Sequence, residues 1–523
     1  MVLANSPTRG VSMQRNKSLL GFTLLTALTM CSCYHDFAKG GGGGGGGGGS
    51  NKVSVVLTAN NPPLTLGLLS FKVVPTSVTL APGTGSQTTL SINNGNGFAY
   101  DLARLQSDSG FLGTATTVPN GTITTITVMI ASVQVTFFNG TTFALTNPAC
   151  AVGAVCVATF AGPFTASVTT SQAISGNTGL SININLGNTM VINGSSLSVT
   201  FSSTNTLTVS TLPRQNANLA AGQLDLIEDI TGTVTLSGSN VTITPAGVVN
   251  RPPITAVTNA STVLDEDPTL TLCVTPTQGT VSSCVSANQA ASMDAVLNSD
   301  GTFTAQEIEP LLASPVVDTV EGVVTSIAST SQTQFTMIVT DIIPASSSSK
   351  IGGLTVGVPL RVNLAAGPAF HVDSKGLGVS ASFPASYGQF TNGTNTTALK
   401  VGQEVAVHVP SFTAASGTTP ASANSVDSVT LRWSRFFAPI STTGSAQFNV
   451  ASLPSYFGFT PASALGVEIF TGTQGTKGVT NLDGVASGSP PAATPPVGIR
   501  GLYIEDPANT LIPAFFAAKV RQH

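Results

Sequence analysis

The stretch Glu228–Ile243, EDITGTVTLSGSNVTI, carries the pattern on which the fold prediction rests. Val234 and Leu236 alternate with polar residues before a Ser-Gly-Ser-Asn segment, and Val241 and Ile243 flank a threonine after it. Alternation with a period of two, interrupted by turn residues, is typical of an antiparallel β-hairpin with one apolar face. We therefore predict a hairpin in which the two apolar pairs face each other.

The same plan returns later in the chain. Val320–Val339, VEGVVTSIASTSQTQFTMIV, repeats it with Gly322 in the place of Gly232, and a looser third copy begins at Ala438–Val450, APISTTGSAQFNV. Internal repetition of this length indicates a series of small domains rather than one large fold.

The composition favours extended structure throughout. Only 8% of the residues are charged and 41% are hydrophobic, while 54 glycines and 31 prolines provide turns. Gly179–Leu186 and Leu197–Ser202 alternate strictly, and Thr122–Phe138 is long enough for a strand that bends or pairs with two neighbours. The region before the repeats is therefore predicted to be an antiparallel β-sandwich.

These patterns predict an all-β protein in which an N-terminal β-sandwich is followed by two or three small β-barrel modules. A signal peptide and a glycine-rich linker precede the sandwich. The predicted boundaries are a signal peptide at 1–33, a flexible linker at 34–52, the sandwich at 53–222, barrel modules at 223–315 and 316–435, and a barrel-like module at 436–523.

The first residues have the layout of an export signal. Arg15 and Lys17 precede the apolar run Ser18–Met30, which is too short to span a bilayer and ends at Cys31 and Cys33. This arrangement resembles the lipobox of bacterial lipoproteins, in which a cysteine preceded by a small residue becomes lipidated. Cys33 fits this role better than Cys31, which stays the alternative, and an ordinary secretory signal with two incidental cysteines is also open.

Ten consecutive glycines, Gly40–Gly49, follow the cysteines. A glycine-rich coil of this length reaches about 25 Å by random-coil scaling, so it would lift a folded domain off a lipid surface. A homopolymer without a role is the alternative interpretation.

Two longer regions resemble known families of domains. Residues 99–137, AYDLARLQSDSGFLGTATTVPNGTITTITVMIASVQVTF, are similar to the core of a prealbumin-like sandwich domain of unknown function. The three-copy region resembles the small OB-like β-barrel domains of unknown function found in bacterial envelope lipoproteins. The resemblance implies this architecture and an envelope location, and it carries no catalytic residues.

The other four cysteines form two local pairs, Cys150 with Cys156 and Cys273 with Cys284. In an exported protein, close spacing and an even count indicate two hairpin disulfides. A four-cysteine zinc site is the alternative, although the spacings lack the CxxC pattern.

A weak calcium candidate lies in Asn298–Glu309. Asn298, Asp300 and Glu307 fall at the third, fifth and twelfth positions of an EF-hand loop, but its first position is Val296. A β-turn between two strands explains the same residues.

Two further groups of histidine and carboxylate residues are candidates for a functional site. His371 and Asp373, with His408, could form a metal or acid–base site, or be surface residues of strands. Asp265–Asp267 is an acidic turn before a proline.

Arg432, Trp433, Arg435 and Phe436 form the densest aromatic and basic cluster. Aromatic faces stack on sugars and bases, so the cluster is a weak binding candidate, and packing between two modules is the alternative.

The functional expectation follows from these features. A net charge of -4 with 19 Lys and Arg spread thinly argues against nucleic-acid binding. We expect no cofactor and no enzymatic activity, but a bacterial cell-envelope protein, anchored by lipid in the outer membrane and facing the periplasm or exterior. It would be a scaffold or binding module for glycan or protein. The alternatives are a secreted polysaccharide hydrolase, with Glu307 and Glu309 or Asp373 as its carboxylates, and a calcium-dependent adhesin.

Overall fold

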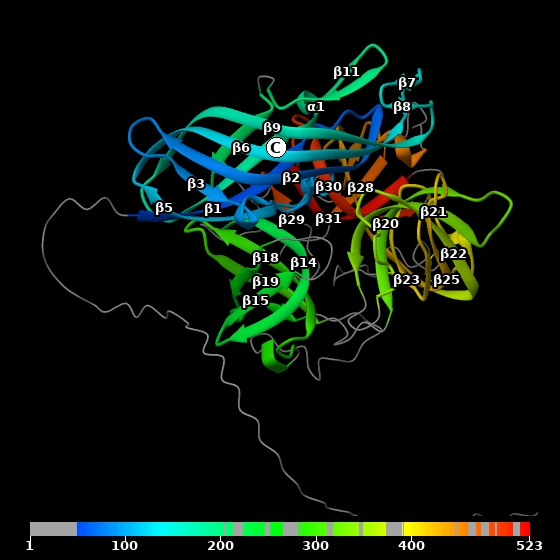
Figure 1. Cartoon of the computed structure of the whole chain (residues 1–523). Helices are drawn as coiled ribbons and strands as arrows, with labels where there is room; N and C mark the ends of the chain where they lie inside the picture. The colour runs from blue at the N-terminus through cyan, green and yellow to red at the C-terminus, as the bar shows by residue number, and fades with distance from the viewer. Residues whose placement is uncertain are drawn as a thin grey trace, which may run out of the picture. The chain divides into compact units, whose positions relative to one another are not determined.

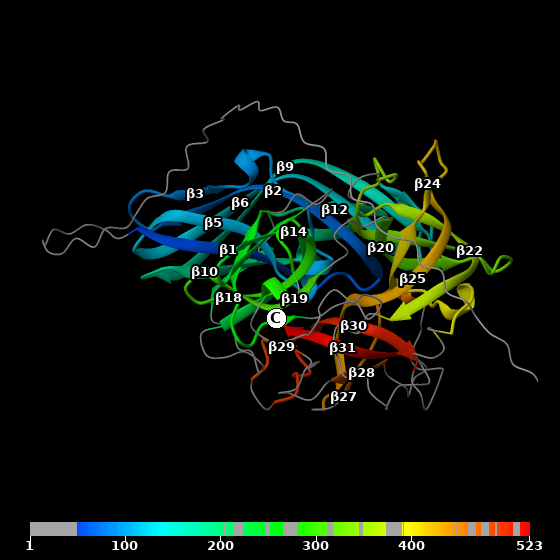
Figure 2. The same ribbon diagram turned by 90° about the horizontal axis from the view of Figure 1, so that it is seen from below.

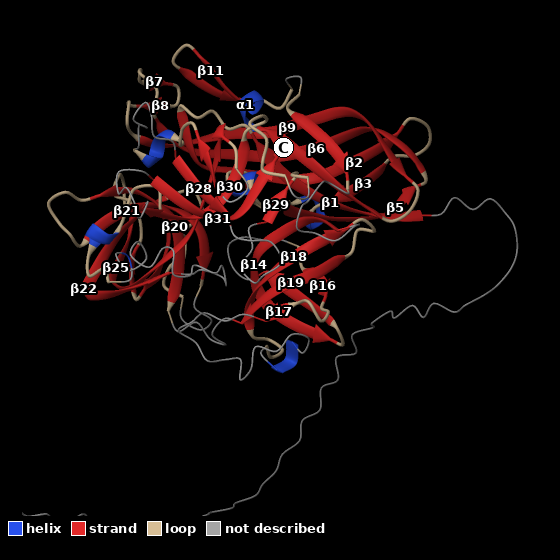
Figure 3. Ribbon diagram, turned by 180° about the vertical axis from the view of Figure 1, so that it is seen from behind, coloured by secondary structure: helices blue, strands red, loops and turns tan. Residues whose placement is uncertain are grey.

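The computed structural model shows an all-β protein whose helices, within the described residues, are single short turns (Figure 3). The described residues from Ser50 onward belong to one compact unit. In the part of the chain that is described, no helix has the length and apolar character needed to cross a membrane. The structure describes residues 50–202, 205–212, 223–245, 252–264, 281–283, 285–310, 317–344, 349–372, 390, 392–444, 447–458, 467–471, 481–486, 489–505 and 513–523.

The first domain is a sandwich of two sheets, but it is not antiparallel throughout as predicted, because one of the sheets is mixed (Figure 1). One sheet has the order β13-β10-β1-β5, in which β1 and β10 are parallel, and the other has the order β3-β2-β6-β9 with β4 beside β2. The elements are β1 (Ser50–Asn60), β2 (Leu66–Pro82), β3 (Thr88–Ser91), η1 (Asn93–Gly95), β4 (Tyr100–Asp101), η2 (Arg104–Gln106), β5 (Gly110–Pro119), β6 (Gly121–Asn139), β7 (Leu145–Thr146), β8 (Ala149–Cys150), β9 (Val155–Ile174), β10 (Thr178–Asn185), α1 (Leu186–Thr189), β11 (Met190–Asn193), β12 (Ser196–Val199) and β13 (Leu207–Thr211).

The long apolar run in the middle of the sandwich is one strand. β6 pairs with β2 along one edge and with β9 along the other, which confirms that the run pairs with two neighbours. Its buried residues, such as Ile126, Val128 and Ile130, alternate with threonine and methionine and belong to the sandwich core. The first strand begins at Ser50, so residues 50–52 of the predicted linker belong to the sandwich.

Barrel 1 follows the sandwich and closes on itself. β14 pairs with β15 and β18, β15 with β16, β16 with β19 in parallel, and β19 with β18, so the strands close in the order 1-2-3-5-4. This is the OB-like layout that the resemblance implied. The elements are β14 (Gln223–Ser237), β15 (Asn240–Pro245), β16 (Ile254–Val257), β17 (Val263–Leu264), η3 (Val281–Ser283), β18 (Ala290–Asn298) and β19 (Phe303–Pro310).

The opening hairpin of barrel 1 is confirmed in its register. Val234 lies opposite Ile243 and Leu236 opposite Val241, as the alternation predicted. The turn between them contains Gly238 in the left-handed conformation, with a φ of 60°.

Barrels 2 and 3 close in the same order and share a strand. β25 is the fifth strand of barrel 2 and, from Trp433 onward, the first strand of barrel 3, where it pairs with β30 (Figure 2). The predicted boundary between residues 435 and 436 therefore lies inside one strand. The elements are β20 (Asp318–Ile327), β21 (Gln334–Ile343), β22 (Pro359–Val372), η4 (Thr396–Ala398), β23 (Glu404–Val409), β24 (Ser411–Thr413), β25 (Ala421–Ala438), β26 (Ile440–Thr442), β27 (Gln447–Val450), η5 (Ser455–Phe457), β28 (Val467–Thr471), β29 (Asn481–Asp483), β30 (Val497–Glu505) and β31 (Pro513–Gln522).

All three barrels pack against the sandwich. The core of barrel 1 includes Val56 and Phe111 of the sandwich, and the Phe111 ring lies edge-on to Phe303 with centroids 4.9 Å apart. The core of barrel 3 includes Leu69 of the sandwich. Lys72 of the sandwich donates to the carbonyl of Val356 in barrel 2 over 3.3 Å, and burial lowers the pKa of this lysine.

The repeated glycine has a steric role. Gly232 and Gly322 lie in the first strands of barrels 1 and 2, each paired with the second strand on one side and the fourth on the other. A Cβ atom at Gly232 would lie 2.2 Å from the carbonyl oxygen of Thr244, and one at Gly322 would lie 2.6 Å from that of Ile338. Only glycine lets the two backbones approach this closely.

We expect Gly232→Ala and Gly322→Ala each to lower the free energy of unfolding by about 1–3 kcal/mol, because the new methyl group meets a strand carbonyl. Differential scanning calorimetry would measure the shift in melting temperature. Gly352→Ala is the matched control, because a Cβ there meets no atom within 4 Å. Equal melting of all three variants would contradict the steric explanation.

Candidate functional site

The segment Tyr100–Gly110, which we call the junction segment, is buried along its whole length although it contains three charged residues. Asp101 stabilises its first turn, because its Oδ1 accepts hydrogen bonds from the backbone amides of Phe71 (2.8 Å) and Ala103 (3.0 Å). The η2 turn follows directly. The charged side chains of Arg104 and Asp108 then reach residues of barrels 2 and 3.

A buried arginine of the shared strand lies at the centre of this junction. The Nε of Arg435 donates to the Oδ2 of Asp108 over 2.9 Å, and its Nη1 donates to the Oε2 of Glu404 over 3.2 Å. All three side chains are less than one tenth exposed. Glu404 also accepts a 2.8 Å hydrogen bond from the hydroxyl of Thr340. Asp108 comes from the sandwich and Glu404 from barrel 2, so one guanidinium joins both to the strand that leads into barrel 3.

A second buried arginine holds barrel 3 to the same segment. The Nε of Arg521, in β31, donates to Asp483 over 2.6 Å, and its two terminal nitrogens donate to the carbonyl of Asp108 and the hydroxyl of Ser109. Arg521 and Asp483 are both fully buried. Asp108 therefore accepts from Arg435 with its side chain and from Arg521 with its backbone.

Two further ion pairs lie nearby. Arg104 of the junction segment donates to the carbonyl of Thr340 over 3.1 Å and contacts Asp341 at 3.4 Å, which joins the sandwich to β21. Arg432 contacts Glu321 at 2.9 Å within barrel 2.

Burial makes these ion pairs costly to break. A buried charge that loses its partner keeps its desolvation penalty without the compensating attraction, which typically destabilises a protein by about 3–5 kcal/mol. These buried ion pairs therefore hold the sandwich and barrels 2 and 3 together. Their role in this structure is to stabilise the contact between the modules.

Tyr456 lies beside the same network, buried in the core of barrel 3. Its hydroxyl donates to the carbonyl of Arg435 over 3.2 Å. Burial, with a smaller contribution from Glu404, raises the pKa of Tyr456 far above its usual value.

The aromatic and basic cluster predicted as a binding site lies inside the protein. Trp433 and Phe436 are each 1% exposed and Arg435 is 8% exposed, so their faces offer no platform for a ligand. The guanidinium carbon of Arg500 lies 5.5 Å from the centre of the Trp433 ring, and Phe436 packs on Phe515. This corrects the binding interpretation in favour of packing between modules.

The calcium candidate forms a hairpin turn between β18 and β19. The amide of Gly301 donates to the carbonyl of Asn298, and Asp300 accepts from the backbone and the hydroxyl of Thr302. Glu307 lies further along β19, opposite Asp294. In the part of the chain that the structure describes, no three His, Cys, Asp or Glu side chains are placed to hold a metal ion.

Of the two predicted disulfides, the one between Cys150 and Cys156 is present. Cys273 and Cys284 lie outside the described residues, as do Cys31, Cys33, Asp265–Asp267 and Asp373. Glu309 is buried in β19, His371 lies in β22, and His408 contacts Asp427 at 3.6 Å on the surface of barrel 2.

Sequence reasoning missed the junction segment and both buried arginines as partners. The sequence does contain a signal for these arginines. Charged residues are rare in this chain, and Arg435 and Arg521 occur within strands of mostly apolar residues, which indicates buried charges. Comparisons of the chain with protein-family models, curated proteins and solved structures found no match.

We expect Arg435→Met to lower the free energy of unfolding by about 3–5 kcal/mol, because Asp108 and Glu404 then stay buried without their cation. Chemical denaturation followed by circular dichroism would measure the loss. Asp427→Asn, which removes the exposed pair with His408, is the control and should change stability by less than about 1 kcal/mol. Similar losses for both variants would show that burial does not set the strength of the Arg435 pairs.

The ionisation of Tyr456 should depend on folding. Because its pKa is raised in the folded protein and is close to 10 in the unfolded chain, the unfolded chain binds fewer protons above about pH 10, and stability falls as pH rises. Absorbance at 295 nm should show no difference between wild type and Tyr456→Phe until the protein unfolds. A phenolate signal from Tyr456 near pH 10 in the folded protein would contradict this.

Proposed function

We propose that this chain is a lipid-anchored protein of the bacterial cell envelope that acts as a rigid, non-catalytic scaffold or binding module for glycan or protein. The observation that carries the proposal is the set of ion pairs and hydrogen bonds that the buried side chains of Arg435, Arg521 and Arg104 make across the junction. They join the sandwich to barrels 2 and 3, which supports a fixed arrangement of these modules.

The use of charge in this molecule supports a structural role. The chain has few charged residues, and those with buried ion pairs lie in the junction rather than in an exposed cluster. Buried ionic groups are retained in some proteins because they fix one arrangement of packed elements. A protein that displays binding surfaces benefits from the same property, because pre-organised surfaces lose less entropy on binding.

The anchor rests on the N-terminal sequence. Cys31 and Cys33 follow a basic and apolar segment, and the ten glycines then separate them from the first strand at Ser50. This order provides a site for lipid, a spacer and a folded domain in turn.

Metabolic labelling with a clickable fatty acid tests the anchor. We expect label on the wild type and on Cys31→Ala, and none on Cys33→Ala, because Ser32 makes Cys33 the better lipobox cysteine. Loss of label only in Cys31→Ala would move the anchor to Cys31. A wild-type chain without label, recovered from the medium, would contradict the anchor.

A glycan array probed with residues 48–523 tests the scaffold role. Binding of the protein to an arrayed glycan without release of reducing sugar supports a binding module. If the protein binds no glycan on the array, a protein ligand is sought next. Release of reducing sugar would contradict the non-catalytic proposal and favour the hydrolase.

A further inference from the structure

Large exposed hydrophobic side chains gather at one end of the sandwich. Among the described residues, five such side chains are exposed, and four of them lie at this end: two flank the β7–β8 hairpin, one lies in β11 and one near the start of β9. We call these four the tip: Phe143, Val152, Val157 and Val191, with exposed fractions of 42%, 54%, 40% and 38%. The fifth, Val257, lies in barrel 1 and is 43% exposed.

The two hairpins of the tip are held together by backbone hydrogen bonds. The amide of Thr146 donates to the carbonyl of Ser195 and the amide of Leu197 donates to that of Asn147, both over 2.8 Å. The tip is therefore one end of the sandwich rather than two separate loops.

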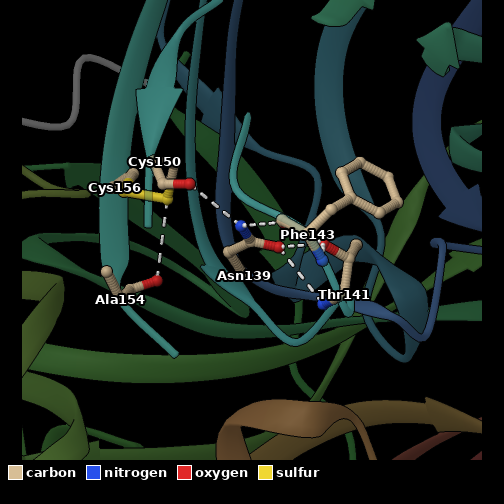
Figure 4. The surroundings of a disulfide bond; sticks show 6 residues. All are labelled: Asn139, Thr141, Phe143, Cys150, Ala154 and Cys156. Carbon is tan, nitrogen blue, oxygen red and sulfur yellow. Dashed lines mark hydrogen bonds between the residues drawn. A yellow bond between two sulfur atoms is a disulfide. The ribbon is translucent and has the colours of Figure 1, made fainter. Parts of the chain in front are cut away.

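The loop that carries Phe143 is organised before any partner arrives. The side-chain amide of the buried Asn139 donates to the carbonyls of Phe143 and Cys150, and its oxygen accepts from the amide and hydroxyl of Thr141 (Figure 4). The disulfide joins Cys150 to Cys156 at the start of β9. An apolar ring held on a braced loop loses little entropy on binding, which is the property of an interface anchor.

The tip lies in a part of the chain without charge. Ser109–Pro213 contains no Asp, Glu, Lys, Arg or His, although the whole protein has a net charge of -4. The tip therefore offers no charge for a charged partner to pair with, which favours a partner whose own contact surface is uncharged.

Barrel 3 lies next to the base of the tip, because Phe138 and Val155 of the sandwich pack against its core and a Cβ atom at Gly140 would meet Ser455, whereas the first described residue of the chain lies at the other end of the sandwich. Ser50 lies opposite Pro119, next to the start of β6, whereas the tip lies beyond the other end of β6 at Asn139 (Figure 1). A strand of this length extends about 60 Å, so Ser50 lies far from Phe143.

We propose that the tip is a self-association surface that binds the tip of a second copy of this chain. Two identical uncharged surfaces approach without like-charge repulsion. In a dimer with two-fold symmetry, the same apolar side chains are buried in both copies. A bilayer is the less favoured occupant, because anionic lipids are recognised by lysine and arginine next to apolar residues and the tip has neither. This proposal does not depend on the lipid anchor or on a glycan ligand.

Sedimentation velocity of residues 48–523 over a range of concentrations tests the proposal. We expect a reversible dimer in the wild type. Phe143→Ser and Val152→Ser should each weaken the dimer at least about tenfold, whereas Phe143→Leu should keep most of the affinity. Val257→Ser is the control, because its exposure matches that of Phe143, and it should leave the dimer unchanged. Melting temperatures should be equal in all variants, because the replaced side chains are exposed.

Three outcomes would overturn the proposal. The first is a monomer at every concentration. The second is a dimer that Val257→Ser weakens as much as the tip variants do, or that no tip variant weakens. The third is binding to phosphatidylcholine and phosphatidylglycerol vesicles that Phe143→Ser abolishes while the protein in solution stays monomeric, which would assign the tip to lipid.

Discussion

The architecture depends on one constraint, which is that a buried guanidinium must keep its carboxylate partners. Arg435 meets Asp108 from the sandwich and Glu404 from barrel 2, in a place that water does not reach. Moving any of these elements would leave an unpaired charge in a medium of low polarity. The relative positions of the three modules are therefore coupled through one side chain.

The shared strand extends this coupling into barrel 3. β25 pairs with strands of barrel 2 along its first part and with β30 of barrel 3 along its last part. Since no linker separates the two barrels, a rotation of one would have to bend a strand that is hydrogen-bonded on both sides. Arg521 then joins the last strand of barrel 3 back to Asp108 and Ser109. Barrel 3 is thus attached at its first and its last strand.

Local features of the fold follow from the sequence, because they depend on neighbours in the chain. The alternation in Glu228–Ile243 predicts the hairpin and its register, and the repeated glycine predicts a second barrel of the same plan. The distant features do not follow in this way. The pair Asp108 and Arg435 joins positions 327 residues apart, and no local pattern encodes that contact.

The aromatic and basic cluster shows why composition alone misleads. Trp433 and Phe436 have the side chains of a stacking platform, but a strand that serves two barrels needs large apolar residues toward both cores. Trp433 accordingly belongs to the core of barrel 2 and Phe436 to that of barrel 3. Arg435 between them points to the junction instead. One strand therefore supplies residues to the core of barrel 2, to the core of barrel 3 and to the junction, and the resulting sequence resembles a binding site.

Charged and uncharged residues occupy different parts of the sandwich. Its buried charged groups Asp101, Arg104 and Asp108 lie in the junction segment, while the segment from Ser109 onward is uncharged up to Pro213. Charge in the junction is specific, because each group needs a partner at one distance and direction. An uncharged surface imposes no such demand on what it meets, so shape and apolar contact decide its partners. The contrast explains how a chain with so few charges holds the sandwich and barrels 2 and 3 together and still exposes a long uncharged part of the sandwich.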